Sequence, residues 1–176
     1  MSTVRLIAFS APAIRRWRLN ACAISCAASI PKLFVNVDAL KRLLHWALLA
    51  LVLHGLWETA QLPLYTLWHE ATALRIVVYV VHCLIGDVLI AMGAYLITAT
   101  IFRNIDWPWR DVWRGGAIMI ALGLAYTGFS EWYNVYQLRA WSYAASMPLV
   151  MGIGLAPLMQ WIVVPVLMII VIRRWR

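Results

Sequence analysis

The chain has 176 residues, of which 64% are hydrophobic and only 12% are charged. This composition excludes an ordinary soluble domain, in which about 25% of the residues are charged, and indicates a membrane protein. The 15 Lys and Arg residues exceed the 7 Asp and Glu residues and give a net charge of +8. We interpret this excess as basic loops facing an anionic membrane surface, and we expect no nucleic-acid partner because no soluble basic module is visible.

Residues 1–43 precede the first long apolar run and are predicted to form a basic cytoplasmic leader, disordered or lying at the membrane interface. Residues 15–30 also resemble a weak signal peptide, with three Arg residues before a short, mildly apolar stretch. Cleavage there would export the new N-terminus and would contradict the charge distribution described below. The leader is therefore the preferred interpretation of this segment.

Four apolar runs are long enough to cross the hydrocarbon core of a membrane, which takes ~20 helical residues. They cover approximately residues 44–66, 76–102, 115–137 and 145–172. The fourth is expected to be bent or broken, because Pro148, Gly152, Gly154 and Pro157 fall inside it. Short connections favour antiparallel packing of consecutive helices. The predicted fold is an all-α, four-transmembrane-helix bundle, with one membrane domain over residues 44–172 and a basic cytoplasmic tail over residues 173–176.

The Lys and Arg residues are distributed unevenly among the connections. Thirteen of them lie before the first span, between the second and third spans, or in the tail, and only Arg75 and Arg139 lie in the other two connections. Cytoplasmic loops carry the excess of basic residues, so this bias predicts that both termini are cytoplasmic. The expected location is the plasma membrane, which is the inner membrane of a cell that has two.

Three carboxylic residues, Glu58, Asp87 and Glu131, fall inside the predicted spans, where an ionisable side chain costs ~2.5–3.5 kcal/mol. The same spans contain no Lys or Arg at depth. They do contain other polar side chains, namely His54, Gln61, His82, Asn134 and Gln160. Two imidazolium groups could neutralise only two of the three carboxylates. The site is therefore expected to hold protons, to bind a cation or to open to water.

Helical spacing places several of these residues together in the outer half of the bilayer. His54, Glu58, Gln61 and Tyr65 follow the pattern i, i+4, i+7, i+11 and lie on one stripe, which should face the bundle interior. In the third span, Glu131 and Asn134 share a face with Thr127, while Tyr126 and Ser130 are further lining candidates. His82 and Asp87 are about 140° apart around the second span, so one of them is expected to face a neighbouring helix.

We interpret this cluster as the site of an integral membrane enzyme that acts on a lipid-like or otherwise apolar small molecule. Glu58 and Glu131 are the candidate acid and base, and His54 or His82 would tune them, because these side chains perform general acid–base catalysis when held out of water. The predicted lining residues are Gln61, Tyr65, Asp87, Asn134 and Gln160. Isomerisation, hydration and hydrolysis all fit this set.

Two cofactor alternatives use the same residues. Carboxylates and imidazoles from facing helices form metal sites in bundles, although no ExxH or HExxH motif is present. The candidate ligands of one or two divalent cations are His54, Glu58, His82, Asp87 and Glu131. The other alternative is a b-type haem held between His54 and His82 on adjacent helices.

Two further alternatives involve no catalysis. The chain could be a subunit or assembly factor of a larger membrane complex, in which the polar groups bond to a partner helix, a pigment or a lipid. It could also be a proton or small-solute carrier, which would have to oligomerise because four spans enclose little pore and no inverted repeat is visible.

Overall fold

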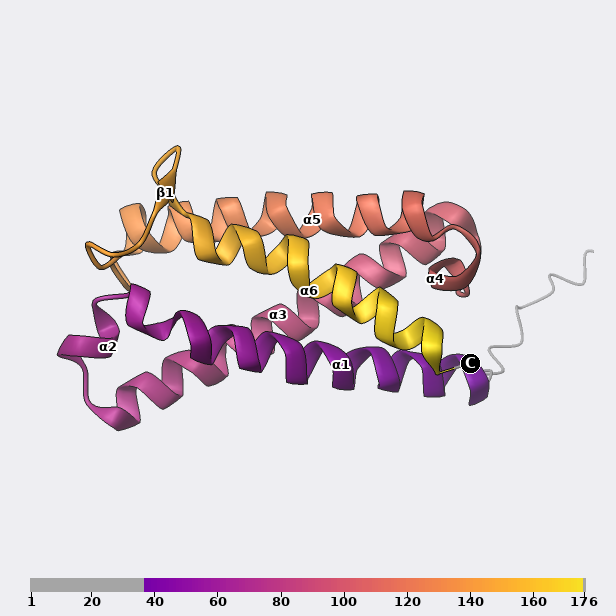
Figure 1. Cartoon of the computed structure of the whole chain (residues 1–176), viewed down its shortest axis with the longest axis horizontal. Helices are drawn as coiled ribbons and strands as arrows, with labels where there is room; N and C mark the ends of the chain where they lie inside the picture. The colour runs from indigo at the N-terminus through magenta and orange to yellow at the C-terminus, as the bar shows by residue number, and fades with distance from the viewer. Residues whose placement is uncertain (1–36, 176) are drawn as a thin grey trace, which may run out of the picture. The chain divides into compact units, whose positions relative to one another are not determined.

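The computed structural model describes residues 37–175, which form an all-α membrane bundle (Figure 1). Four helices are long and apolar enough to cross a membrane. They are α1 (Val37–Gln61), α3 (Ala73–Phe102), α5 (Val112–Trp132) and α6 (Leu155–Arg174). The predicted fold class is confirmed. Residues 1–36 of the predicted leader lie outside the described residues, and so does the whole signal-peptide alternative. The last part of the predicted leader, residues 37–43, forms the start of α1.

Short elements join the spanning helices at the two ends of the bundle. At one end, η1 (Leu62–Leu64) and α2 (Leu67–Glu70) connect α1 to α3, and α4 (Trp107–Arg110) connects α3 to α5 at the other end. A π-helical turn, η2 (Tyr133–Leu138), extends α5. The hydroxyl of Thr72 accepts a hydrogen bond from the Arg75 amide at 3.4 Å and caps the start of α3. Arg103 adopts a left-handed conformation where α3 ends.

The fourth span differs from its predicted bounds, because the helix begins at Leu155 and not near residue 145. The preceding segment contains a hairpin of β1 (Leu149–Val150) and β2 (Ile153–Gly154), with Met151 and Gly152 at positive φ in a two-residue turn. Pro157 lies in the first turn of α6, where a missing backbone N–H costs no hydrogen bond. The interruption expected from the proline and glycine residues is present, but the hairpin is apolar, so composition alone does not show where the helix begins.

The four helices pack in a ring in which consecutive helices are neighbours and α6 closes back onto α1. Glycines allow close approach inside this ring. A Cβ atom at Gly123 of α5 would overlap the indole of Trp161 in α6, and one at Gly115 would overlap the indole of Trp107. The buried core is correspondingly rich in large side chains, with Trp46, Tyr95 and Trp107 in mutual ring contact.

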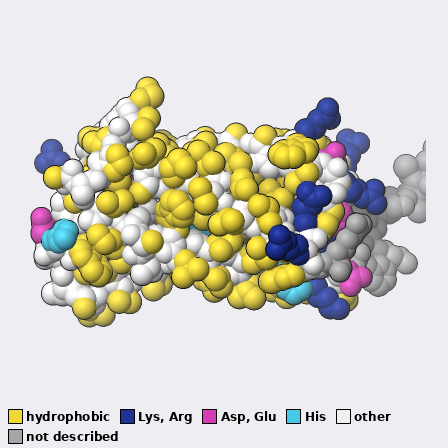
Figure 2. Space-filling view, in the orientation of Figure 1, with side chains coloured by type: hydrophobic (Ala, Val, Ile, Leu, Met, Phe, Trp, Pro, Cys, Tyr) yellow, Lys and Arg dark blue, Asp and Glu magenta, His cyan; other side chains and the backbone are white. Residues whose placement is uncertain are grey.

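Basic side chains gather at one end of the bundle, as Figure 2 shows, while hydrophobic side chains cover the visible flank between the ends. This basic end contains the start of α1, the end of α3, α4, the start of α5 and the end of α6. Its described cations are Lys41, Arg42, Arg103, Arg110, Arg114, Arg173 and Arg174. The opposite end carries Arg75 and Arg139, so the charge bias of the sequence corresponds to two physical ends of the bundle.

Candidate functional site

A cavity of about 130 Å³ lies between α1, α3 and α5, toward the opposite end. A water molecule needs at least ~10–15 Å³ of such space, so the cavity has room for several. All three intramembrane carboxyl groups line it, and no Lys or Arg of the described chain does. The other polar side chains on its wall are Gln61, Tyr65, Tyr79, His82, Cys83, Tyr126, Thr127, Ser130 and Trp141. The cavity therefore combines an acidic wall with an apolar membrane setting.

Glu131 is held by two tyrosines from the loops at this end. The Tyr143 hydroxyl donates to Glu131 Oε2 at 2.6 Å, and the Tyr65 hydroxyl donates to the same atom at 3.5 Å. Backbone hydrogen bonds join the two loops, from the Thr66 amide to the Ser142 carbonyl at 3.0 Å and from the Ala144 amide to the Leu64 carbonyl at 2.9 Å. The pairing of the loops thus positions both phenols over the carboxylate.

Both phenols remain donors over a wide pH range. Burial raises the pKa of Tyr143 above its ordinary value, and the hydrogen bond to Glu131 raises it further. Burial also raises the pKa of Tyr65, with the nearby negative charge of Glu131 as the next cause. Each hydroxyl therefore keeps its proton and its role as a donor to the carboxylate.

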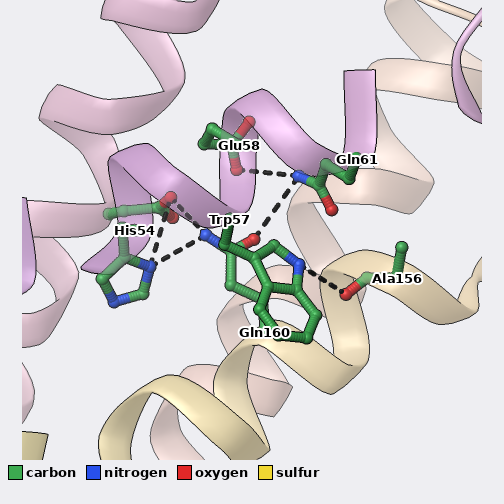
Figure 3. A network of polar contacts seen from close by, with 7 residues as sticks. His54, Trp57, Glu58, Gln61, Ala156 and Gln160 are labelled. Carbon is green, nitrogen blue, oxygen red and sulfur yellow. Dashed lines mark hydrogen bonds and ion pairs between the residues drawn. The ribbon is translucent and has the colours of Figure 1, made fainter. Parts of the chain in front are cut away.

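A second group of polar side chains ties α1, α3 and α6 together (Figure 3). Gln61 Nε2 donates to Glu58 Oε1 at 2.9 Å and lies 3.5 Å from Gln160 Oε1. Gln160 Nε2 in turn donates to Asp87 Oδ2 at 2.8 Å and lies 2.8 Å from His54 Nδ1. Gln160 is 2% exposed and contacts both other helices through this one amide, so it is the bridge of the network.

A neighbouring contact fixes the start of α6 against α1. The indole of Trp57 donates to the Ala156 carbonyl at 3.2 Å, as Figure 3 also shows. Ala156 precedes Pro157, which lines the cavity. The contact therefore holds the first turn of α6 at the cavity wall.

Most of the predicted site residues lie either on the cavity wall or in a layer directly behind it, and Asn134 lies in neither place. Glu58, Glu131, His82, Gln61, Tyr65 and Asp87 line the cavity. His54 and Gln160 do not line it and form the layer behind, where the His54 imidazole is fully buried and its ring lies 4.9 Å from that of Trp161. His54 Nδ1 is 3.4 Å from Asp87 Oδ2 and thereby fixes this carboxyl group.

Asn134, predicted as a lining residue, does not lie on the cavity wall. Its Nδ2 donates to the Ser130 carbonyl at 2.8 Å and lies 3.2 Å from the Ser130 hydroxyl oxygen. Short polar side chains near a helix end commonly bond back to a carbonyl one turn earlier, and this local bond turns Asn134 away from the site. Ser130 itself lines the cavity.

The predicted cofactor ligand sets are not assembled. Within residues 37–175, no three His, Cys, Asp or Glu side chains are arranged to hold a metal ion. His54 lies behind the wall, while a Glu131 oxygen is occupied by Tyr143. The haem alternative requires His54 and His82 to face one space, yet only His82 lines the cavity.

Sequence reasoning did not assign Tyr143, Trp141 or Cys83 to the site. Tyr143 and Trp141 come from the connection between η2 and α6, where no periodic pattern relates them to the helices. Cys83 carried a usable signal, because it is four residues before Asp87 and shares its helix face.

Comparison of the chain with family models, with curated proteins and with solved structures finds no match. The class that the fold and the site define is that of an all-α membrane protein with an acidic cavity between its spanning helices. The functional argument below therefore rests on the residues of this chain.

Proposed function

We propose that the protein is an integral membrane enzyme that binds a small, largely apolar molecule in the cavity and performs acid–base chemistry on it with Glu58 and Glu131. The observation that carries this proposal is that three carboxyl groups line one cavity with no Lys or Arg on its wall. Three adjacent negative charges without counter-ions are unfavourable in an apolar setting, so the site retains at least one proton. A protonated and an ionised carboxyl group on one cavity are the pair that such chemistry requires.

The hydrogen bonds support a division of roles within this pair. Glu131 accepts from two phenolic hydroxyls, and donors of this kind favour the ionised form of a carboxyl group. Glu58 accepts from the neutral amide of Gln61. We therefore assign Glu131 as the base and Glu58 as the acid that holds the proton.

Asp87, His54 and Gln160 act as positioning residues in this proposal. They link α1, α3 and α6 through contacts of 2.8 to 3.4 Å. Gln61 joins this network to Glu58. The orientation of the acid thus depends on three helices, a rigid support of the kind that a catalytic group needs.

The wall also indicates the chemistry of the substrate. Gln61 Oε1 is buried and has no donor within the described residues, so a hydroxyl or amine of the bound molecule would satisfy it. Tyr126 lines the cavity and is 52% exposed, so we propose that the cavity opens toward the lipid beside this residue of α5. A lipid-like molecule with one polar group fits both features.

The orientation follows from the charge bias. Because basic residues concentrate on cytoplasmic loops, we propose that the basic end and both termini face the cytoplasm and that the protein lies in the plasma membrane. The cavity would then lie in the outer half of the bilayer.

The test is a comparison of organic extracts from membranes that contain the wild type, Glu58→Gln or Glu131→Gln, analysed by mass spectrometry. Glutamine keeps the size of the side chain and removes its acid–base function. Glu70→Gln, at an exposed residue of α2 outside the cavity, is the matched control. We expect a compound whose amount is the same in the wild type and the Glu70→Gln control but different in the two site variants, at equal protein levels. Identical extracts from wild type and site variants would contradict the proposal, and loss of the variant proteins from the membrane would assign the carboxyl groups to folding.

A further inference from the structure

A second polar cavity, of about 310 Å³, lies at the basic end of the bundle. The side chains that surround it come from the first turns of α1, from α4 with the residue before it, and from the residue after α6. They are Asp38, Lys41, Arg42, His45, Asp106, Trp109, Arg110 and Trp175. None of these residues takes part in the acidic cavity, so this site is independent of the proposed chemistry.

Three cations, Lys41, Arg42 and Arg110, and two carboxylates, Asp38 and Asp106, line this second cavity, and the excess of one positive charge favours an anion. Arg42 Nη1 lies 3.2 Å from Asp106 Oδ1, which fixes the guanidinium group at the cavity wall. Arg110 is exposed at the rim and forms no ion pair within residues 37–175. Arginine matches the geometry of phosphate oxygens because its planar group presents parallel N–H donors. Arg42 and Arg110 could thus contact one phosphate from two elements.

Two donors in this cavity lack an acceptor. Arg42 Nε, Trp109 Nε1 and the acceptor Asp106 Oδ1 are buried and have no hydrogen-bond partner within the described residues. The ion pair with Arg42 Nη1 holds Asp106 Oδ1, so the two donors are left over. A buried donor without an acceptor costs free energy, so a pair of them on one cavity indicates an absent group with acceptor oxygens. Trp175 flanks the same space, with its ring 5.7 Å from that of His45. Tryptophan is enriched where lipid headgroups lie.

We propose that this second cavity binds the phosphate group of an anionic membrane phospholipid. The cavity lies at the end of the spanning helices, which is the level of the lipid phosphates in a bilayer. The surrounding cations attract an anionic leaflet, and the two unsatisfied donors give the phosphate a defined place. The ligand is thus a phosphate monoester or diester, whose source in the membrane is the lipid headgroup.

The test uses the full chain in detergent and native mass spectrometry, with phosphatidylglycerol, phosphatidylcholine and inorganic phosphate as probes. Trp109→Phe removes the indole donor and keeps the aromatic bulk, and Arg110→Gln removes an exposed charge without disturbing the core. The matched controls are Trp113→Phe, an 88% exposed tryptophan at the same end but outside the cavity, and Arg139→Gln at the opposite end.

We expect phosphatidylglycerol to bind more tightly than phosphatidylcholine, with about tenfold weaker binding for each site variant and no change for the controls. Equal binding of the two lipids, or equal effects of site and control variants, would overturn the proposal. Displacement of phosphatidylglycerol by millimolar inorganic phosphate would assign the cavity to free phosphate and would overturn the lipid source.

Discussion

Gly86 offers a substitution whose effects on function and on stability should have opposite signs. It lies on the wall of the acidic cavity, between Cys83 and Asp87 on α3, and a Cβ atom there would meet no heavy atom within 4 Å. In Gly86→Leu the isobutyl group adds four carbon atoms. They project from the wall into a cavity of about 130 Å³ and take up the space next to Asp87. The substitution should therefore keep the substrate from its position beside this carboxyl group.

The same substitution should not destabilise the protein. Leucine is favoured over glycine in a helix interior by about 0.8 kcal/mol, and no heavy atom lies within 4 Å of the new Cβ atom, which points toward the open cavity. We expect the free energy of unfolding to stay equal or to rise by up to about 1 kcal/mol. Activity on the substrate should fall at least tenfold, because the reacting molecule can no longer occupy the site.

The assay follows alkylation of Cys83 by N-ethylmaleimide in a Cys22→Ser, Cys26→Ser background, together with the extract comparison described above. Cys83 lines the cavity one helical turn from position 86, so the added side chain should slow its alkylation. Gly93→Leu is the matched control, because Gly93 lies on the same helix with equal space around it but outside the cavity. Wild-type alkylation and activity in Gly86→Leu, or equal losses in Gly93→Leu, would refute the reasoning.

Three further substitutions test the supports of the site by thermal unfolding in detergent. Tyr143→Phe removes the 2.6 Å hydrogen bond to the carboxylate and should cost about 1–3 kcal/mol. Because burial raises the pKa of Tyr143, wild-type stability should decline as the pH rises above about 10, the value in the unfolded chain, and the decline should be smaller in Tyr143→Phe. Gln160→Leu leaves the His54 imidazole and the Asp87 carboxyl group without their shared partner and should cost about 1–3 kcal/mol, whereas unchanged stability would show that the bridge is dispensable. Gly123→Ala should cost about 1–3 kcal/mol through overlap with Trp161, while Gly128→Ala on the same helix, with open space around it, should cost nothing.

The spanning helices were predictable because their signal is a bulk property of the sequence. Runs of about 20 apolar residues read directly as helices in a membrane, and four such helices are present. The hairpin before α6 was not predictable from the same signal. Leu149, Val150 and Met151 are as apolar as the residues of a membrane helix. The nearby proline and glycine residues predict an interruption, but they do not show whether the helix begins before or after it.

The site was predictable to the extent that helical periodicity determines it. Glu58 and Gln61 share a stripe of α1, and both line the cavity with Tyr65. Periodicity does not determine how helices are rotated against one another, so His54 was assigned to the site although it lies behind the wall. Tyr143 reaches Glu131 through the pairing of two loops, and that contact has no periodic signature in the chain.

The most direct test of the central claim is labelling of the full chain in membranes with a hydrophobic carbodiimide, which reacts with protonated carboxyl groups, followed by mapping of the modified residues by mass spectrometry. The account predicts modification of Glu58 within the acidic cavity, no modification of the exposed Glu70, and loss of the Glu58 label in Gly86→Leu but not in Gly93→Leu. Absence of label at Glu58, Asp87 and Glu131, or labelling that Gly86→Leu leaves unchanged, would contradict a proton-holding site that apolar molecules reach.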